Sequence, residues 1–354
     1  MPSPKLAEAA AIRRRLLTWF GRRARSLPWR STRDPYAIWV SEIMLQQTQV
    51  ATVIPFYEHF LEAFPTVRHL ARAPVERVLR LWSGLGYYRR ARHLHEAARF
   101  LVRTHGARFP QDYPQARSLP GIGDYTARAI LSMAFGQPYA VLDGNVARVV
   151  ARLLALKGNL HQRAFRRTVE AQLDALLARR DPGNFNQALM ELGQTICLPR
   201  APRCNTCPLR EWCQACQHGN PESFPEPRPR RATESRCLAA ALIQRTEKVA
   251  LIRGLDDGLL PDLWNFPSAF GDSQSAARSH LHQKLADLTH GAVSLAESLA
   301  QLRHGITYRS IQVNVYPAQI RLPRQGKAFR WVSLSKLSQG AVSQLARKIA
   351  DELL

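Results

Sequence analysis

Five of the six cysteines of this 354-residue chain lie close together, between Cys197 and Cys216. Four of them follow the spacing C-x6-C-x2-C-x5-C, at Cys197, Cys204, Cys207 and Cys213. Four thiolates in one short loop are the ligand set of a cubane iron–sulfur cluster, which takes one sulfur from each cysteine.

Zinc is the alternative, because Cys204-x2-Cys207 and Cys213-x2-Cys216 are also two CxxC pairs. Five residues separate these pairs, whereas the usual zinc ribbon has roughly 15–20 in that place. The spacing therefore favours one [4Fe-4S] cluster and leaves Cys216 and Cys237 as spare thiols. Cysteines grouped in this way indicate a metal site in a reducing compartment rather than a disulfide framework.

Two carboxylates have sequence settings that suit chemistry. Glu42 lies in the apolar segment Tyr36–Gln47, which predicts burial, a raised pKa and a proton to donate at neutral pH. A helical glutamate is more commonly a solvated one. Asp143 follows an apolar run and precedes a Gly-Asn turn, so a helix N-cap is its alternative role. One acid and one anion in different environments are the pair that cleavage of a glycosidic bond requires.

A Gly-x-Gly turn separates two helical patterns at Leu119–Ala127. Gly121 and Gly123 let the backbone approach an anion closely, and the N–H groups of a helix beginning at Asp124 can hold a phosphate. This pattern predicts a helix–hairpin–helix that binds the DNA backbone without reading its sequence. An ordinary corner between two helices is the alternative.

The charge balance points to a polyanionic partner. The chain has 50 Lys and Arg residues and 27 Asp and Glu residues, which gives a formal charge of +23 at pH 7. Nucleic acid is the commonest partner of so basic a protein. The apolar fraction of 45% is that of a folded chain, and the length favours two or three domains over one.

We expect helices to position Glu42, Asp143 and the hairpin glycines, because apolar residues recur every three or four positions from residue 6 to about 195. We expect an all-α domain over 1–220, with the cysteine loop at 197–213. A Pro- and Arg-rich linker follows over 221–235. Over 236–354 the apolar period is two with one helical stretch, which predicts an α+β domain.

The chain is expected to have no membrane span and to act in the cytoplasm of a bacterium. Its longest stretch without Asp, Glu, Lys or Arg is Ile43–Tyr57, which has 15 residues and contains a proline. A transmembrane helix needs about 20 apolar residues.

These motifs together resemble the adenine DNA glycosylases of base-excision repair. The resemblance begins with Leu27–Arg30, Asp34–Tyr36 and Trp39–Val50 and covers nearly the whole chain. It continues in order through Gly84–Tyr88, the hairpin, Leu142–Val146 and the four spaced cysteines. The implied architecture is a helix–hairpin–helix glycosylase domain with an iron–sulfur loop, followed by a Nudix-like domain.

The resemblance implies removal of adenine paired with 8-oxoguanine or guanine in double-stranded DNA, by an enzyme that acts as a monomer. The target base must leave the stack, because its glycosidic bond is unreachable inside the duplex. Glu42 would protonate adenine N7 and then assist the attacking water. Asp143 would stabilise the sugar cation, supported by Tyr125 and Asn145.

The resemblance also implies the residues that contact the substrate. The adenine pocket would be lined by Arg25, Trp29, Leu45 and Gln187. The DNA-binding residues would be Gln47 and Tyr88, which wedge into the stack, with Gly121 and Gly123 in the hairpin.

Two other functions compete with this one. A bifunctional pyrimidine-lesion glycosylase of the endonuclease III type has a Lys two residues after the second hairpin glycine, whose amine forms a Schiff base. This chain has Tyr125 there, and a phenol cannot form that imine, so a monofunctional enzyme is expected. A catalytically silent DNA-binding protein is disfavoured because Glu42 and Asp143 are both present.

The C-terminal domain resembles the Nudix-like module with which these enzymes sense 8-oxoguanine, most clearly at Leu263–Pro267. Between Gly271 and Gly291 it lacks the paired glutamates that hold Mg²⁺ in a Nudix hydrolase, so nucleotide hydrolysis is not expected. The recognition loop departs from the usual Phe-Ser-His: Thr307 keeps a hydroxyl, and Tyr308 stands where histidine is expected. Both are expected to contact the DNA.

Overall fold

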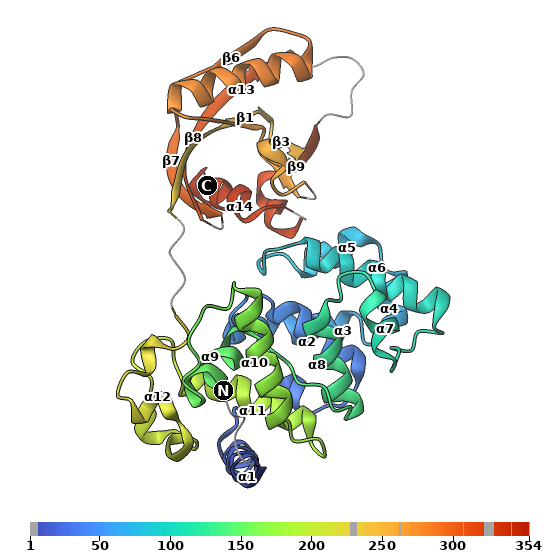
Figure 1. Ribbon diagram of the computed structural model, residues 1–354. Coiled ribbons are helices and arrows are strands. Elements are labelled where there is room, and N and C mark those ends of the chain that lie inside the picture. Colours follow the sequence, from blue (N-terminus) through green and yellow to red (C-terminus); the bar gives the residue numbers. More distant parts are fainter. Residues whose placement is uncertain are drawn as a thin grey trace. The chain divides into compact units, whose positions relative to one another are not determined.

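The computed structural model describes residues 6–226, 232–261, 263–306, 308–321, 329–340 and 342–353 (Figure 1). The chain divides into two compact units. Unit 1 comprises Met1–Ala73 and Arg92–Pro229, and unit 2 comprises Pro74–Ala91 and Arg230–Leu354. The predicted Thr307 contact and the middle of the predicted linker, 227–231, lie outside the described residues.

Unit 1 is all-α in its described part, as the helical periodicity predicted. Its long helices are α1 (Leu6–Arg23), α2 (Pro35–Leu45), α3 (Val50–Ala63), α8 (Asp124–Phe135), α9 (Gly144–Leu153), α10 (Arg163–Leu176) and α11 (Pro182–Thr195). Short helices are α4 (Val67–Arg72), α7 (Tyr113–Ser118) and α12 (Gln214–Gln217), while α6 (Arg89–Thr104) crosses the boundary between the two units.

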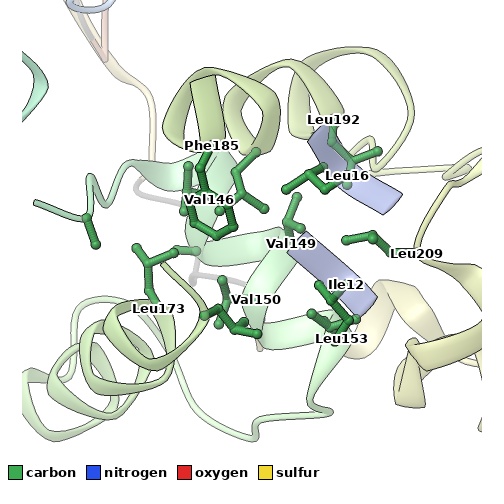
Figure 2. Close-up of a cluster of buried hydrophobic side chains, with 14 of the residues drawn as sticks. Ile12, Leu16, Val146, Val149, Val150, Leu153, Leu173, Phe185, Leu192 and Leu209 are labelled. Atoms are coloured by element: carbon green, nitrogen blue, oxygen red, sulfur yellow. The ribbon is translucent and has the colours of Figure 1, made fainter. Parts of the chain in front are cut away.

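One face of α9 anchors the core of unit 1. Val146, Val149, Val150 and Leu153 recur at the three- and four-residue spacing that puts side chains on one side of a helix. Figure 2 shows this face among side chains from α1, α10 and α11, including Leu16, Leu173 and Phe185. The packing fixes the axis of α9, and with it the position of the residue that begins the helix.

Helix α2 is buried over most of its length. Every residue from Tyr36 to Met44 is buried, including Glu42, and the helix packs against α3 and α8. Its start is set by Asp34, whose side chain accepts a hydrogen bond from the Tyr36 amide at 3.0 Å. Because α2 has no solvent-facing side over this stretch, its one carboxylate is enclosed with the apolar residues.

A buried amide ties α11 to the segment that leads into α9. Asn186 is fully buried, and its Oδ1 accepts a hydrogen bond from the Val141 amide at 3.1 Å. Its Nδ2 donates to Ser132 Oγ at 3.0 Å and to the Tyr139 carbonyl at 2.9 Å. These bonds hold the extended residues immediately before Asp143.

Unit 2 contains two β-sheets in its described part. In the five-stranded sheet the strand order is β5 (Ser268–Gly271), β1 (Glu234–Leu242), β8 (Arg309–Ile320) and β6 (Val293–Leu295), and β7 (Ala300–Ile306) also pairs with β8. The second sheet orders β2 (Gln244–Arg245), β3 (Lys248–Arg253) and β4 (Trp264–Asn265), with β9 (Arg330–Ser333) on β3. Strands β1 and β8 run parallel, and the other described pairs are antiparallel.

A helix covers each face of the larger sheet (Figure 1). Leu238 and Ala240 of β1 join a core with α14 (Gln344–Leu353), whereas Ala239 and Ala241 join a core with α13 (Gln274–Thr289). This alternation is the period of two that the sequence showed. The α+β class of this unit is therefore confirmed.

Unit 2 also includes a segment from within residues 1–220, the range predicted for the helical domain. Pro74–Ala91 contains α5 (Val75–Leu81) and the Gly84–Tyr88 motif. Within the unit, Arg347 of α14 donates a hydrogen bond to Ser83 Oγ at 2.6 Å.

We expect Asn186→Ala to destabilise unit 1 by at least about 2 kcal/mol, because a buried group that loses its partner costs about 1–3 kcal/mol. Urea-induced unfolding followed by circular dichroism measures the change. Asn184→Ala is the matched control, since Asn184 is exposed and bonds only Asp181 among the described residues, at 3.0 Å. Equal midpoints for the two variants would show that the buried amide does not hold this segment.

Candidate active site

A cavity of about 600 Å³ in unit 1 brings together residues that are distant in sequence. Its lining includes seven of the predicted site residues: Arg25, Glu42, Leu45, Gln47, Tyr125, Asp143 and Asn145. Met190 and Gln194 of α11 complete one wall, and Thr48 to Ala51 complete another. The cavity therefore joins the two carboxylates with a phenol, an amide and a guanidinium.

Glu42 is 5% exposed, and its Oε2 has no hydrogen-bond partner among the described residues. Burial raises the pKa of its carboxyl to about 7, a hydrogen bond from Tyr125 opposes the rise, and the charge of Asp143 adds to it. A carboxyl with this pKa is mostly protonated below pH 7 and ionised above it. It can therefore give up a proton and take one back near neutrality.

Tyr125 stands in the first turn of α8, directly after the hairpin. Its hydroxyl lies 3.4 Å from Met190 Sδ, and burial together with the charges of Glu42 and Asp143 holds its pKa well above the ordinary value. The side chain is therefore a neutral phenol that donates hydrogen bonds within the cavity.

Asp143 is the N-cap of α9 and also lines the cavity. Its Oδ1 accepts a hydrogen bond from the Val146 amide at 2.6 Å, and its Oδ2 accepts one from Asn145 Nδ2 at 2.9 Å. Asn145 is fixed in turn by Arg148, which donates to Asn145 Oδ1 at 3.0 Å. Asp143 thus caps α9 and lines the cavity at the same time, because capping fixes the direction of the carboxylate.

A buried ion cluster that the sequence analysis missed supports the cavity from behind. Glu191 of α11 is 1% exposed, and its Oε2 binds Arg25 at 2.7 Å and Arg30 at 2.8 Å. Burial raises the pKa of Glu191, but hydrogen bonds from the two arginines outweigh it and leave the pKa lowered. Arg25 also donates to Gln194 Oε1 at 2.6 Å. The sequence signal that could have revealed Glu191 is a charged residue within an apolar helix.

Among the residues predicted for the adenine pocket and the wedge, Trp29, Gln187 and Tyr88 do not line this cavity. Trp29 is buried edge-on against Tyr57, with ring centroids 5.4 Å apart. Gln187 is half-buried on α11, one residue beyond the buried Asn186.

The two tyrosines of the Gly84–Tyr88 motif have opposite environments. Tyr88, the predicted wedge, is 7% exposed, and its hydroxyl lies 3.4 Å from Ser83 Oγ. Tyr87 is 45% exposed and has a φ of 49°, and the guanidinium of Arg90 lies over its ring. Gln47 is also exposed, with a φ of 59°. Of the two tyrosines, Tyr87 is the one whose ring meets solvent.

The hairpin has the geometry that its glycines predicted. Gly121 has a φ of 74°, and a Cβ there would come within 2.5 Å of His93 Cβ. Gly123 is the N-cap of α8, so the free amides of that helix begin at the turn. Asp124, the acidic residue at this end, is paired with Arg117 at 2.5 Å. This pairing reduces the repulsion that an approaching phosphate would meet.

The cysteine loop folds around a small cavity lined by Cys197, Cys204, Cys207, Cys213 and Cys216. Arg152 of α9 ties the loop down, because its guanidinium donates to the carbonyls of Leu198, Pro199 and Phe224. Burial, together with the neighbouring thiols, raises the pKa of Cys207 to about 12 and that of Cys213 to about 11. Burial therefore disfavours the thiolate form at both positions.

The donor set fits an iron–sulfur cluster. No three His, Cys, Asp or Glu side chains in the described part of the chain are arranged to hold a single metal ion. In a cubane cluster each cysteine binds a different iron, so the sulfurs stand farther apart than the ligands of one ion. Thiols from all four cysteines of the C-x6-C-x2-C-x5-C pattern line one cavity, which is the donor set that such a cluster takes.

In unit 2, Tyr308 lies in the turn between β7 and β8 and is half-buried. The guanidinium of Arg309 lies over its ring, 5.6 Å from the centroid. Its carbonyl accepts a hydrogen bond from the Glu234 amide at 3.1 Å, which fixes the backbone of the turn on β1.

Comparisons with known proteins agree with this fold. Residues 40–174 match the HhH-GPD superfamily of base excision DNA repair proteins. A solved structure of a thermostable thymine-DNA glycosylase is 27% identical, with a TM-score of 0.55, covering 60% of this chain and 98% of its own. The helical unit is thus a base-excision glycosylase fold.

The relatives identify the family. The adenine DNA glycosylase of Rattus norvegicus is 33% identical over 97% of this chain and 78% of its own length. That of Homo sapiens is 32% identical over 97% and 74%. The chain belongs to the adenine DNA glycosylase family, and it is a hydrolase of N-glycosyl bonds in DNA. Among the described residues, no helix is long and apolar enough to cross a membrane.

We expect Tyr125→Phe to raise the pKa of Glu42 above about 7, because the lost hydroxyl donates the hydrogen bond that lowers this pKa. The measurement is a pH titration by NMR with carboxyl-labelled glutamate, in which Glu42→Gln assigns the signal. Tyr113→Phe, a change in a tyrosine that bonds Asp124, serves as control and should leave the titration unchanged. A pKa that falls in Tyr125→Phe would contradict the assigned hydrogen bond.

Proposed function

We propose that this enzyme removes adenine paired with 8-oxoguanine or guanine in double-stranded DNA. The observation that carries the proposal is Glu42, a buried carboxyl with a pKa of about 7 that shares one cavity with Asp143. One carboxyl that keeps its proton and one carboxylate that faces the same space are the two groups that glycosidic cleavage needs.

In the proposed reaction, the adenine nucleotide turns out of the duplex into the cavity. Glu42 gives its proton to N7 of adenine, and the electron pair of the bond between C1′ and N9 leaves with the base. The carboxylate of Asp143 stabilises the resulting sugar cation. The ionised Glu42 then takes a proton from water as that water attacks C1′, which restores the starting state of the enzyme.

Tyr125 and Asn145 position these two groups. The phenol hydrogen-bonds Glu42, and the amide of Asn145 holds Asp143 Oδ2. No lysine is among the residues that line the cavity. Because strand cleavage through a Schiff base requires an amine, the enzyme leaves an abasic site, and the endonuclease III-type reaction is not favoured.

For the adenine pocket, the geometry supports Arg25 and Leu45, which line the cavity. Trp29 and Gln187, which the resemblance also assigns to the pocket, are not among the residues that line this cavity. Gln47 in unit 1 would contact the DNA, and so would the Gly84–Tyr88 motif of unit 2, where Tyr87 is the exposed tyrosine and the predicted Tyr88 is buried in the turn. Gly121 and Gly123 would bind the phosphate backbone through amides.

A [4Fe-4S] cluster would be held by Cys197, Cys204, Cys207 and Cys213, and when bound it would stiffen the loop without taking part in base release. The loop carries Arg200, Arg203 and Arg210, whose charges suit phosphate contact. The Nudix-like unit would sense 8-oxoguanine through Thr307 and Tyr308. The enzyme would act as a monomer in the cytoplasm of a bacterium.

We expect Glu42→Gln to abolish adenine release while DNA affinity is kept. Loss of one acid–base group commonly costs about 10²–10⁴ in rate, and here the same group acts in both steps. Single-turnover base release from duplexes with adenine opposite 8-oxoguanine measures the loss. Glu58→Gln, an exposed glutamate on α3, is the control and should behave as wild type.

The same assay decides the substrate. Duplexes with adenine opposite guanine and with thymine glycol are compared with adenine opposite 8-oxoguanine. Release of thymine glycol with strand cleavage would favour the endonuclease III-type reaction. Near-normal turnover by Glu42→Gln would refute the role given to this carboxyl.

We expect the recognition turn to set the preference for 8-oxoguanine over guanine. Thr307→Ala should reduce this preference roughly threefold to tenfold, the equivalent of one hydrogen bond of about 0.5–1.5 kcal/mol. Tyr308→Ala should cost a further ~1–3 kcal/mol if its ring stacks on a base. Rates on adenine opposite guanine are the internal control, and an unchanged ratio in the double variant would assign discrimination to another surface.

A further inference from the structure

The cysteine cavity contains one thiol more than a cubane cluster uses. Its lining includes Cys216 together with the four cysteines of the C-x6-C-x2-C-x5-C pattern. Cys216 lies on α12, a helix that begins directly after Cys213, the last cysteine of that pattern. It is half-buried like the other four. Cys216 thus lines the cavity, whereas Cys237, the sixth cysteine, lies on β1 in the other unit.

The contacts of Cys216 are with two of the four ligands. Its thiol is hydrogen-bonded to that of Cys204, and its amide donates to the Cys213 carbonyl at 3.1 Å. The Cys213 thiol also takes a hydrogen bond from the Cys216 backbone, whereas the backbone hydrogen bond to the Cys207 thiol comes from Leu209. Cys216 is therefore a direct neighbour of Cys204 and Cys213.

We propose that Cys216 is a substitute ligand, which binds the iron of Cys204 when that ligand is lost. This inference rests on the cluster of the proposed function. The exchange is a ligand substitution without oxidation or reduction. The Cys216 thiol loses its proton as its sulfur forms the new bond to iron, and in the intact chain the released Cys204 sulfur takes up a proton.

The local fold makes this exchange specific to one position. Cys204 begins a short 3₁₀ turn, Cys204–Thr206, whereas Cys216 lies on α12, so the two hydrogen-bonded thiols line the same cavity from different elements. Cys207 ends that turn, and its side chain is among the more deeply buried of the thiols, with a backbone hydrogen bond from Leu209. We expect loss of Cys207 to leave a position that no other thiol fills.

The experiment measures iron bound per chain in the purified full-length protein, with absorbance near 400 nm and electron paramagnetic resonance as further readouts. Alanine replaces each cysteine because a serine hydroxyl can itself bind iron. We expect about four irons per chain in the wild type and in Cys204→Ala. We expect the cluster to be lost in Cys207→Ala and in the double variant Cys204→Ala with Cys216→Ala.

The iron measurements distinguish a failure of the proposed cluster from a failure of the proposed ligand substitution. A wild-type protein without iron would refute the cluster itself. Wild type with iron but Cys204→Ala as depleted as Cys207→Ala would refute the substitution alone. A three-iron cluster held by the remaining three cysteines would appear equally in Cys204→Ala and the double variant, and would also refute it. If Cys204→Ala is insoluble, it is refolded anaerobically with Fe²⁺ and sulfide beside wild type, and its failure to take up iron where wild type does would likewise refute the substitution.

Discussion

The burial of a single carboxyl group, that of Glu42, is the constraint on which the site depends. Helix α2 is enclosed by α3 and α8, so the carboxyl has little water and a pKa of about 7. Removing a charged group from water is costly, and the proton that remains on Glu42 is the direct consequence. The raised pKa of this group thus comes from the same packing that holds the helical unit together.

Asp143 is subject to a different physical demand. Its carboxylate caps α9, one face of which is built into the hydrophobic core through Val149 and Val150 (Figure 2). Asn186 holds the chain just before it. The aspartate therefore cannot turn away from the cavity without breaking a helix cap, whereas a free surface carboxylate would sample many directions. Core packing and site geometry share the same residues here.

Positive charge dominates the chain, yet the charge near the cavity is balanced locally. Glu191 lies between Arg25 and Arg30 and is nearly excluded from water. A buried charge of this kind is tolerated because it is paired and hydrogen-bonded on both oxygens. Its effect is to fix the position of the Arg25 guanidinium at the cavity wall.

The sequence by itself determined the helical and α+β classes, the two carboxylates and the hairpin, because periodicity, turn glycines and a charge in an apolar run are local signals. The grouping of four cysteines was local in the same way. Only the tertiary structure decided which of Tyr87 and Tyr88 is exposed, that Glu191 braces Arg25, that Trp29 and Gln187 lie outside the cavity lining, and that Cys216 joins the other thiols. Each of these depends on how a backbone turn directs a side chain, or on contacts between residues up to 166 positions apart. No local pattern encodes such contacts, since packing between helices settles them after the elements have formed.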